Sequence, residues 1–351
     1  MTTMLETHDL SKSFSMKRSS LSRAASAVGL SKQVDSRVYA VNEVSLSVSK
    51  GEVLGLVGES GCGKSTVGRM IAGLLPATSG TLQFAGKDMT KPSVDTHLNI
   101  QMVFQNPYAS LNPRQRVDQV VSEAAVYHGL VDKKDAQSFV AGLLKQVGLD
   151  PTYASRFPHQ FSGGQRQRIA IARALALNPK FIVCDEAVSA LDVSVQAQIL
   201  NLFMDLRESQ GLTYLFISHN LAVVEYIADR VAIMYLGRIV ELADTRSVFA
   251  RPNHPYTQAL IADAPRLDAK VVEHRPIQGE LPSPLNPPSG CTFHPRCPYA
   301  MPRCSQERPP LVKIDNGHWS ACHLNDADSQ AGGMTEAQEQ SITMLHHDQV
   351  N

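Results

Sequence analysis

A loop at residues 58–65, with the sequence GESGCGKS, carries the side chains best suited to chemistry in this 351-residue chain. Its three glycines allow backbone N–H groups to converge on phosphate oxygens, and a helix that starts at the loop adds the positive end of its dipole. Lys64 can reach the β- and γ-phosphates of a nucleotide, and Ser65 can offer its hydroxyl to Mg²⁺. The loop therefore predicts a nucleoside-triphosphate site, rather than a glycine turn that binds nothing.

Two acidic residues follow an apolar segment at residues 181–185. At the end of a buried strand, Asp185 can hold Mg²⁺ through water, and Glu186 can polarise the water that attacks the γ-phosphate. The alternative is a solvated acidic turn. Beside a phosphate loop, the pair predicts hydrolysis of the bound nucleotide.

Another anion-binding surface is predicted at the sequence SGGQ, residues 162–165, where a serine and two glycines precede a helix. One chain has little use for two phosphate cradles on separate elements. Two chains that face each other would use both, each closing the nucleotide site of the other. The alternative is an ordinary serine N-cap followed by a glycine turn.

Alternating strands and helices must position these residues. The apolar residues 52–57 predict a strand before the loop, and residues 66–75 have helical spacing after it. Residues 181–185 and 213–218 predict further buried strands, which indicates an α/β fold with a mainly parallel sheet covered on both faces. Residues 106–176 are mainly helical in pattern.

Other strands predict a β-rich layer beside this core. Val44, Leu46 and Val48 alternate with polar residues, and residues 80–86 predict another short strand between glycines. Residues 1–14 begin as a possible edge strand. Residues 15–37 are a serine-rich basic insertion, for which we expect a solvated loop, with contact to anionic lipid headgroups as the alternative.

Composition excludes several classes of protein. The formal net charge is zero at pH 7, so charge gives no indication of nucleic acid as a partner. No segment approaches the roughly 18 consecutive apolar residues of a membrane-spanning helix, and the N-terminus lacks the pattern of a signal peptide. We therefore expect a cytosolic chain that reaches a membrane only through partners.

These motifs, in this order, resemble those of ATP-binding-cassette (ABC) transporter ATPases over residues 1–250. The resemblance implies a P-loop NTPase cassette with a RecA-like core, a β-rich layer and a helical subdomain at about 106–176. It implies that Glu186, His219 and Lys64 are catalytic, and that Ser65, Gln105 and Asp185 bind Mg²⁺. It also implies a set of ATP-binding residues: Tyr39, Gly58, Ser60, Gly61, Cys62, Gly63, Lys64, Ser65, Thr66, Gln105, Asp185 and, for the ATP of the opposing cassette, Ser162, Gly163, Gly164 and Gln165.

Three departures from the family pattern leave every catalytic group in place. Ala187 follows Glu186 where the family usually has proline, so we expect a looser turn around the carboxylate. Phe161 opens the signature motif in place of the commoner leucine, and Asn220 follows His219 in place of aspartate.

Four of the six cysteines lie in a proline-rich segment near the C-terminus: Cys291, Cys297, Cys304 and Cys322. Ten of the twenty prolines fall between residues 276 and 310, so this segment needs a staple in place of a large core. In a cytosolic protein such clustering favours metal or iron–sulfur ligation over disulfides. A four-iron, four-sulfur (4Fe–4S) cluster, Zn²⁺ (with His294, His318 and His323 nearby) and free thiols all stay open.

The C-terminal sequence resembles the extension of dipeptide and oligopeptide permease ATPases, over about residues 251–325, followed by a flexible tail at 326–351. Two cassette segments resemble the second ATPase subunit of such systems. The resemblance implies a 4Fe–4S cluster and a bacterial importer of di- or oligopeptides, peripheral on the cytoplasmic face of the inner membrane. Its partners would be two transmembrane permease subunits, a sister ATPase and an extracytoplasmic peptide-binding protein.

Other functions stay open from the residues alone. The same subunit type could serve import of nickel, glutathione or antimicrobial peptides, because the transported molecule does not touch it. A soluble ABC ATPase acting on nucleic acid or ribosomes is a different class, against which stand the single cassette and the lack of a basic stripe. A redox or metal sensor that uses ATP as a switch is a third.

Overall fold

The computed structural model describes residues 2–15, 37–89, 94–263 and 279–326. Apart from its end residues, the insertion predicted at about 15–37 lies outside the described residues. The tail predicted at 326–351 also lies outside them, except for Asp326.

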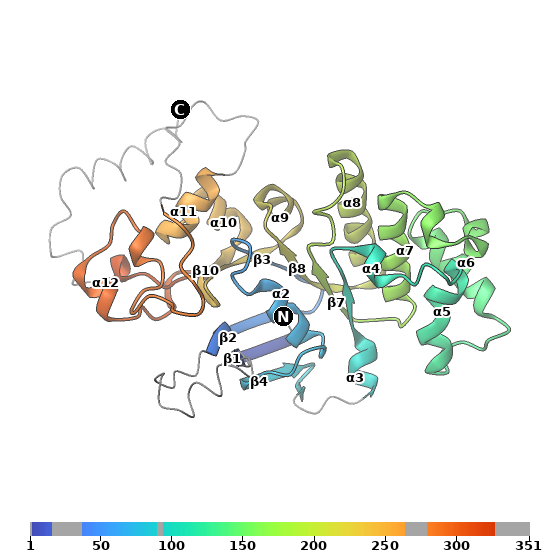
Figure 1. The fold of residues 1–351 in the computed structure, drawn as a ribbon, viewed down its shortest axis with the longest axis horizontal. Helices are drawn as coiled ribbons and strands as arrows, with labels where there is room; N and C mark the ends of the chain where they lie inside the picture. The colour runs from blue at the N-terminus through green and yellow to red at the C-terminus, as the bar shows by residue number, and fades with distance from the viewer. Residues whose placement is uncertain (1, 16–36, 90–93, 264–278, 327–351) are drawn as a thin grey trace, which may run out of the picture.

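The larger of two sheets forms the centre of the molecule (Figure 1). Its strands lie in the order β11 (Val312–Asp315), β12 (His318–Ser320), β10 (Arg238–Asp244), β9 (Arg230–Tyr235), β3 (Val53–Val57), β8 (Thr213–Ser218), β7 (Phe181–Asp185) and β6 (Ile100–Val103). From β9 to β6 the pairs are parallel. Strands β3, β7 and β8 are buried along their whole length, which is why their sequences are continuous apolar runs. The predicted parallel core is confirmed.

The smaller sheet is the predicted β-rich layer. Its order is β2 (Arg37–Ser49), β1 (Thr3–Ser15), β4 (Ser79–Phe84) and β5 (Lys87–Asp88), with all neighbours antiparallel. The prediction of an edge strand at residues 1–14 is wrong, because β1 pairs on one side with β2 and on the other with β4. Both partners come from segments that follow β1 in the chain, so its own pattern could not show them.

Helices cover the larger sheet and form a lobe at one side of it (Figure 1). Within the described residues the lobe contains α4 (Pro107–Ser110), α5 (Val117–Tyr127), α6 (Ala136–Gln146), the 3₁₀ turns η1 (Pro151–Ser155) and η2 (Pro158–Gln160), and α7 (Gly163–Leu175). The remaining helices include α2 (Lys64–Ile71), α3 (Val94–Asn99), α8 (Val193–Gln210), α9 (Leu221–Ile227), α10 (Thr245–Ala250) and α11 (Pro255–Ala262). The helical pattern predicted for residues 106–176 matches the helices of this lobe.

The C-terminal extension joins the larger sheet directly. Strand β12 pairs antiparallel with β10, placing Ser320 opposite Glu241 and Trp319 opposite Leu242. The described part of the extension also holds α11, strand β11, the turn η3 (His294–Arg296), the short helix α12 (Pro302–Gln306) and the turn η4 (His323–Asn325). The larger sheet therefore contains strands from both sides of residue 250. The division of the chain into two domains at that residue stays a prediction.

Three apolar clusters hold these layers together. The first joins the helical lobe to one face of the large sheet through residues such as Leu144 and Phe203. The second fills the space between the two sheets around α2, with Leu54 and Val67 fully buried. The third packs Phe293 of the extension against Tyr235 and Tyr256, with ring centroids 5.3 and 5.4 Å apart. This last cluster anchors the extension to the cassette.

Candidate active site

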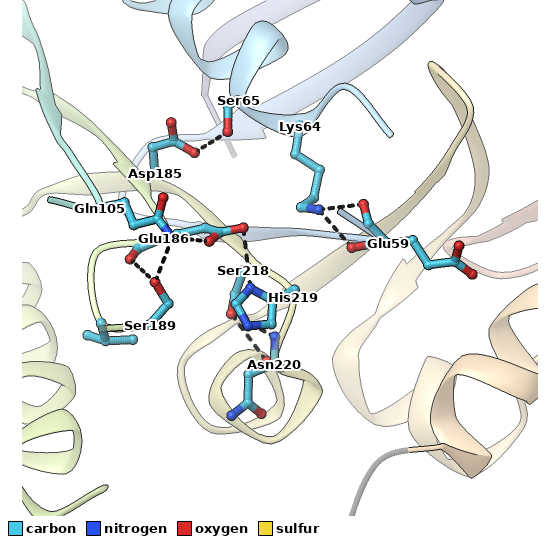
Figure 2. Close-up of polar contacts among 12 residues, drawn as sticks. Glu59, Lys64, Ser65, Gln105, Asp185, Glu186, Ser189, Ser218, His219 and Asn220 are labelled. Atoms are coloured by element: carbon cyan, nitrogen blue, oxygen red, sulfur yellow. Dashed lines mark hydrogen bonds and ion pairs between the residues drawn. The ribbon is translucent and has the colours of Figure 1, made fainter. Parts of the chain in front are cut away.

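The phosphate loop lies between β3 and α2, as the motif requires. Gly63 has φ = 110°, and a Cβ there would lie 2.1 Å from the carbonyl oxygen of Ala40, so only glycine fits. Lys64 is 4% exposed, and its Nζ donates to the carbonyl oxygens of Gly58 at 2.7 Å and Glu59 at 2.9 Å (Figure 2). The ammonium group is thus held at the loop, where it can meet a phosphate.

Ser65 and Asp185 bring the loop and the end of β7 together. The Ser65 hydroxyl donates to Asp185 Oδ1 at 2.7 Å (Figure 2). Burial raises the pKa of Asp185 above its ordinary value, while this hydrogen bond and the charge of Arg69 oppose the rise. A hydroxyl and a carboxylate oxygen side by side are hard oxygen donors of the type that Mg²⁺ prefers.

Glu186 stands at the centre of a group of polar side chains (Figure 2). Its Oε2 accepts a hydrogen bond from Gln105 Nε2 at 2.8 Å, and its Oε1 lies 3.3 Å from Nδ1 of His219. Gln105 Nε2 also donates to Ser189 Oγ at 3.2 Å. The structure therefore brings together Gln105, Glu186 and His219, which are 81 and 33 positions apart in the sequence.

The turn that carries Glu186 is held without a proline. Glu186 has φ = 50°, an uncommon value for a residue with a side chain. Its N–H donates to Ile217 O at 3.0 Å, and its carbonyl accepts from the N–H and the hydroxyl of Ser189 at 3.1 and 3.0 Å. Ala187, only 1% exposed, packs in the first core cluster. The three hydrogen bonds and the packing of Ala187 hold the turn of Glu186 in the absence of the proline that the family usually has there.

The SGGQ segment forms the start of α7, on the helical lobe. The Ser162 hydroxyl caps the helix by accepting from Gln165 N at 3.4 Å, and Gln165 Oε1 accepts from Ser162 N at 3.0 Å. Gly164 packs against Val195, since a Cβ there would lie 2.4 Å from its Cγ1. Figure 1 shows α7 well apart from α2, so this chain does not bring its SGGQ segment to its own phosphate loop.

Tyr39 lies on β2 and is 45% exposed. It lines a pocket of about 230 Å³ together with Arg238, Arg308 and residues of the proline-rich extension that include Pro284 and Pro287. An exposed aromatic ring beside a pocket is a suitable platform for a nucleotide base. The extension thus supplies one wall of this pocket.

The four C-terminal cysteines line one cavity, with His294 and His323 beside them. Burial, with a contribution from the neighbouring thiols, raises the pKa of Cys297 to about 11 and that of Cys322 to about 12. However, among the residues that the structure describes, no group of three or more His, Cys, Asp or Glu side chains is placed to hold a metal ion. The geometry therefore does not support the predicted metal ligation.

Two contacts of the phosphate loop were not predicted. The Glu59 N–H donates to Tyr256 Oη at 2.9 Å, and Arg296 donates to the Glu59 carboxylate at 3.1 Å. These partners are 197 and 237 positions away from Glu59, in the extension, and no local pattern in the sequence indicates them.

The described part of the chain contains no helix that is long and apolar enough to cross a membrane.

Two family models match the sequence. Residues 41–189 match the ABC transporter model, and residues 240–304 match the model of the oligopeptide/dipeptide transporter C-terminal region. Solved cassettes share the fold. The structure of a post-hydrolysis cassette dimer bound to ADP and Pi is 25% identical, with a TM-score of 0.58, covering 69% of this chain and 99% of that one.

Similar proteins cover most of the chain. The oligopeptide transport ATP-binding protein AppF of Bacillus subtilis is 48% identical, over 92% of this chain and 97% of its own length. The oligopeptide transport ATP-binding protein OppF of Salmonella typhimurium is 50% identical, over 78% and 84%. On the strength of these matches, the chain belongs to the ATP-binding proteins of the oligopeptide/dipeptide family of ABC transporters.

Proposed function

We propose that this chain hydrolyses ATP to power the import of di- or oligopeptides through a membrane ABC transporter. The observation that carries the proposal is that Lys64, Ser65, Asp185 and Glu186 lie together beyond the ends of the parallel strands β3 and β7. The C-terminal region supports the peptide substrate, since it matches the family model of oligopeptide and dipeptide transporters. Relatives named for oligopeptide and di/tripeptide transport support it further.

In the proposed ATP site, the backbone of residues 58–66 surrounds the phosphates, and the Lys64 ammonium neutralises their charge. Ser65, Asp185 and Gln105 would hold Mg²⁺, which would screen the charge of the β- and γ-phosphates. Tyr39 stacks on the adenine, beside the pocket that the extension helps to form. Each residue lies on an element that the fold holds in place, so the site is largely formed before ATP binds.

Glu186 is the proposed general base. Its carboxylate accepts a proton from the attacking water, and His219, 3.3 Å from it, contacts the γ-phosphate. Gln105 donates to the same carboxylate at 2.8 Å and so orients Glu186. Because Gln105 lies just before α4, this hydrogen bond also links Glu186 to the start of the helical lobe. The Glu186 side chain is only 16% exposed and lies on a hydrogen-bonded turn, so the base stays in one position.

Two cassettes act together in this proposal. Residues 162–165 of one cassette close the ATP of the other, because α7 presents them at a distance from the chain's own phosphate loop (Figure 1). A sister ATPase is the proposed second cassette. Two transmembrane permease subunits bind the pair at the cytoplasmic face of the bacterial inner membrane, and an extracytoplasmic binding protein delivers the peptide.

The 4Fe–4S cluster stays part of this proposal, and no step of hydrolysis depends on it. What supports it is the cavity that all four cysteines line. Each iron of such a cluster takes its own thiolate, whereas one Zn²⁺ needs all its ligands at a single point. In the described residues, no three of these side chains are yet placed to hold a single metal ion.

The experiment that tests the function is peptide uptake by a strain that carries this chain or its Glu186→Gln variant. Uptake of labelled di- and oligopeptides that requires the chain and stops in the variant supports the proposal. Uptake of nickel or glutathione in place of peptides would contradict the substrate, and an unchanged ATPase rate in the variant would contradict the role of Glu186. Anaerobic purification followed by iron, sulfide and zinc analysis tests the cluster, with Cys297→Ser as its control.

A further inference from the structure

Glu59 is the residue of the phosphate loop that the extension holds. Its N–H donates to Tyr256 Oη at 2.9 Å, and both carboxylate oxygens accept from one terminal guanidinium nitrogen of Arg296 at 3.1 Å. Figure 2 shows the Glu59 carboxylate pointing away from Lys64, so the ion pair does not compete with the site where phosphates bind. Both the backbone and the side chain of Glu59 are therefore fixed from outside the cassette core.

The two partners are themselves rigidly placed. The side chain of Arg296 is 8% exposed and that of Glu59 is 23% exposed, so the pair is largely removed from water. The guanidinium also donates to Tyr235 Oη at 3.4 Å. Tyr256 is fully buried, and its ring lies 4.7 Å from that of Tyr235. A charge that is this buried strongly requires its partner.

The carbonyl of Glu59 is hydrogen-bonded to two groups that are placed to bind the phosphates of ATP. It accepts from Lys64 Nζ at 2.9 Å and from the N–H of Cys62 at 3.3 Å. A shift of Glu59 would therefore move the ammonium group and a loop amide together. Tyr256 and Arg296 therefore hold the residue whose carbonyl contacts both of these groups.

Arg296 lies on the turn η3, between Cys291 and Cys297, two of the four cysteines that line the thiol cavity. The turn is closed by the N–H of Arg296, which donates to Phe293 O at 2.9 Å, and by the N–H of Cys297, which donates to His294 O at 3.3 Å. The turn that carries the guanidinium is therefore continuous with the backbone of two of the cysteines that line the cavity.

We propose that Arg296 and Tyr256 are positioning residues for the phosphate loop, through which the cysteine-bearing extension sets the affinity for ATP. The proposal rests on the proposed binding of ATP phosphates at this loop. The extension acts first on ATP affinity, through Glu59 and Lys64, since neither residue contacts Glu186 or Asp185 among the described hydrogen bonds and ion pairs.

A double-mutant cycle tests the link, using the full chain with Arg296→Met, Glu59→Gln and the two combined. Each single change should raise both the Kd for MgATP and the KM about tenfold, within the range for residues in contact, with kcat nearly unchanged. The double variant should have a Kd for MgATP no higher than that of whichever single variant binds MgATP more weakly. Arg296→Lys should recover part of the affinity, and Tyr256→Phe should weaken binding in the same direction.

Arg303→Met is the matched control, since Arg303 forms its ion pairs with Glu307 and Asp326 inside the extension. It should leave the Kd for MgATP at the parental value. Multiplicative effects of Arg296→Met and Glu59→Gln, or an equal loss in Arg303→Met, would overturn the proposal. Glu59→Gln substitutes no residue of the extension and keeps a polar side chain beside Arg296, so it tests the link even if Arg296→Met unfolds that segment.

The Lys64→Ala variant distinguishes failure of the ATP-site assignment from failure of the link to the extension. If that variant binds MgATP as tightly as the parent, the loop is not the phosphate site and the proposed function fails. If Lys64→Ala abolishes binding while the cycle shows no coupling, the ATP site stands and only the link to the extension is refuted.

Discussion

Lowering the pH should loosen the attachment of the extension, through His254. This histidine is 1% exposed, and its Nδ1 accepts from Tyr256 N at 3.1 Å as the N-cap of α11. Burial lowers the pKa of His254 to about 4, although nearby Glu241 opposes the shift. The folded chain therefore keeps this imidazole neutral at a pH at which an exposed histidine is charged.

The sign and size of the effect follow from linkage. In the unfolded chain the histidine has its ordinary pKa of about 6.5, so between pH 6.5 and 4 the unfolded state binds the extra proton. Stability from this group is complete above pH 6.5 and is lost as the pH falls toward the folded value. Between pH 7.5 and 5.0 the loss in the free energy of unfolding is about 2 kcal/mol.

Trp319 provides the assay, because it is the one tryptophan in the sequence and lies on β12 of the extension. Urea unfolding followed by its fluorescence at pH 7.5 and 5.0 should show the loss in the parent. In His254→Asn, which keeps an N-cap acceptor, the difference between the two pH values should shrink by about 2 kcal/mol. His128→Asn, at an exposed histidine, should keep the parental difference. An unchanged pH dependence in His254→Asn would refute the reasoning.

Three further changes test the site. Glu186→Gln should retain ATP binding but lower the steady-state ATPase rate by about 10²- to 10⁴-fold, the usual contribution of a general base; a parental rate would sink this role. Gly63→Ala forces a Cβ to 2.1 Å from Ala40 O, so the Kd for ATP in equilibrium dialysis should rise beyond detection, and normal binding would contradict the loop geometry. Tyr39→Ala should weaken ATP binding by about 1–3 kcal/mol while Tyr39→Phe keeps it, and equal affinities would remove the stacking assignment.

Much of the nucleotide site could be predicted from the sequence because its parts are local motifs on regular elements. The glycine loop lies between a strand and a helix within about twenty residues, and Asp185 ends a buried apolar run. Such patterns carry their own structural context. Gly237 is a similar local signal, because glycine readily adopts the positive φ that the tight turn between β9 and β10 requires.

The features that the sequence could not show depend on partners far along the chain. β1 lies inside its sheet because two later strands pair with it, and β12 extends the large sheet by pairing with β10. The Glu59–Arg296 pair joins residues 237 positions apart. The glutamate and the arginine each occur in segments with no periodic pattern, so only the folded chain brings them together.

The buried carboxylate of Glu241 shows the same limit. It is fully buried on β10 and accepts from the N–H groups of Asn253 and His254 at 2.8 Å each, and it pairs with His318 Nε2 at 2.7 Å. The sequence offered His318 as a possible zinc ligand, but the structure places this nitrogen on Glu241. His318 therefore helps to fasten the extension to the cassette.

The most direct test of the central claim is a tagged purification of this chain from gently solubilised membranes, with the co-purifying chains identified by mass spectrometry. The account predicts that two polytopic membrane proteins and a second cassette ATPase co-purify with the chain. Recovery of the chain in the soluble fraction, with ribosomes, with nucleic acid or without any partner, would contradict it.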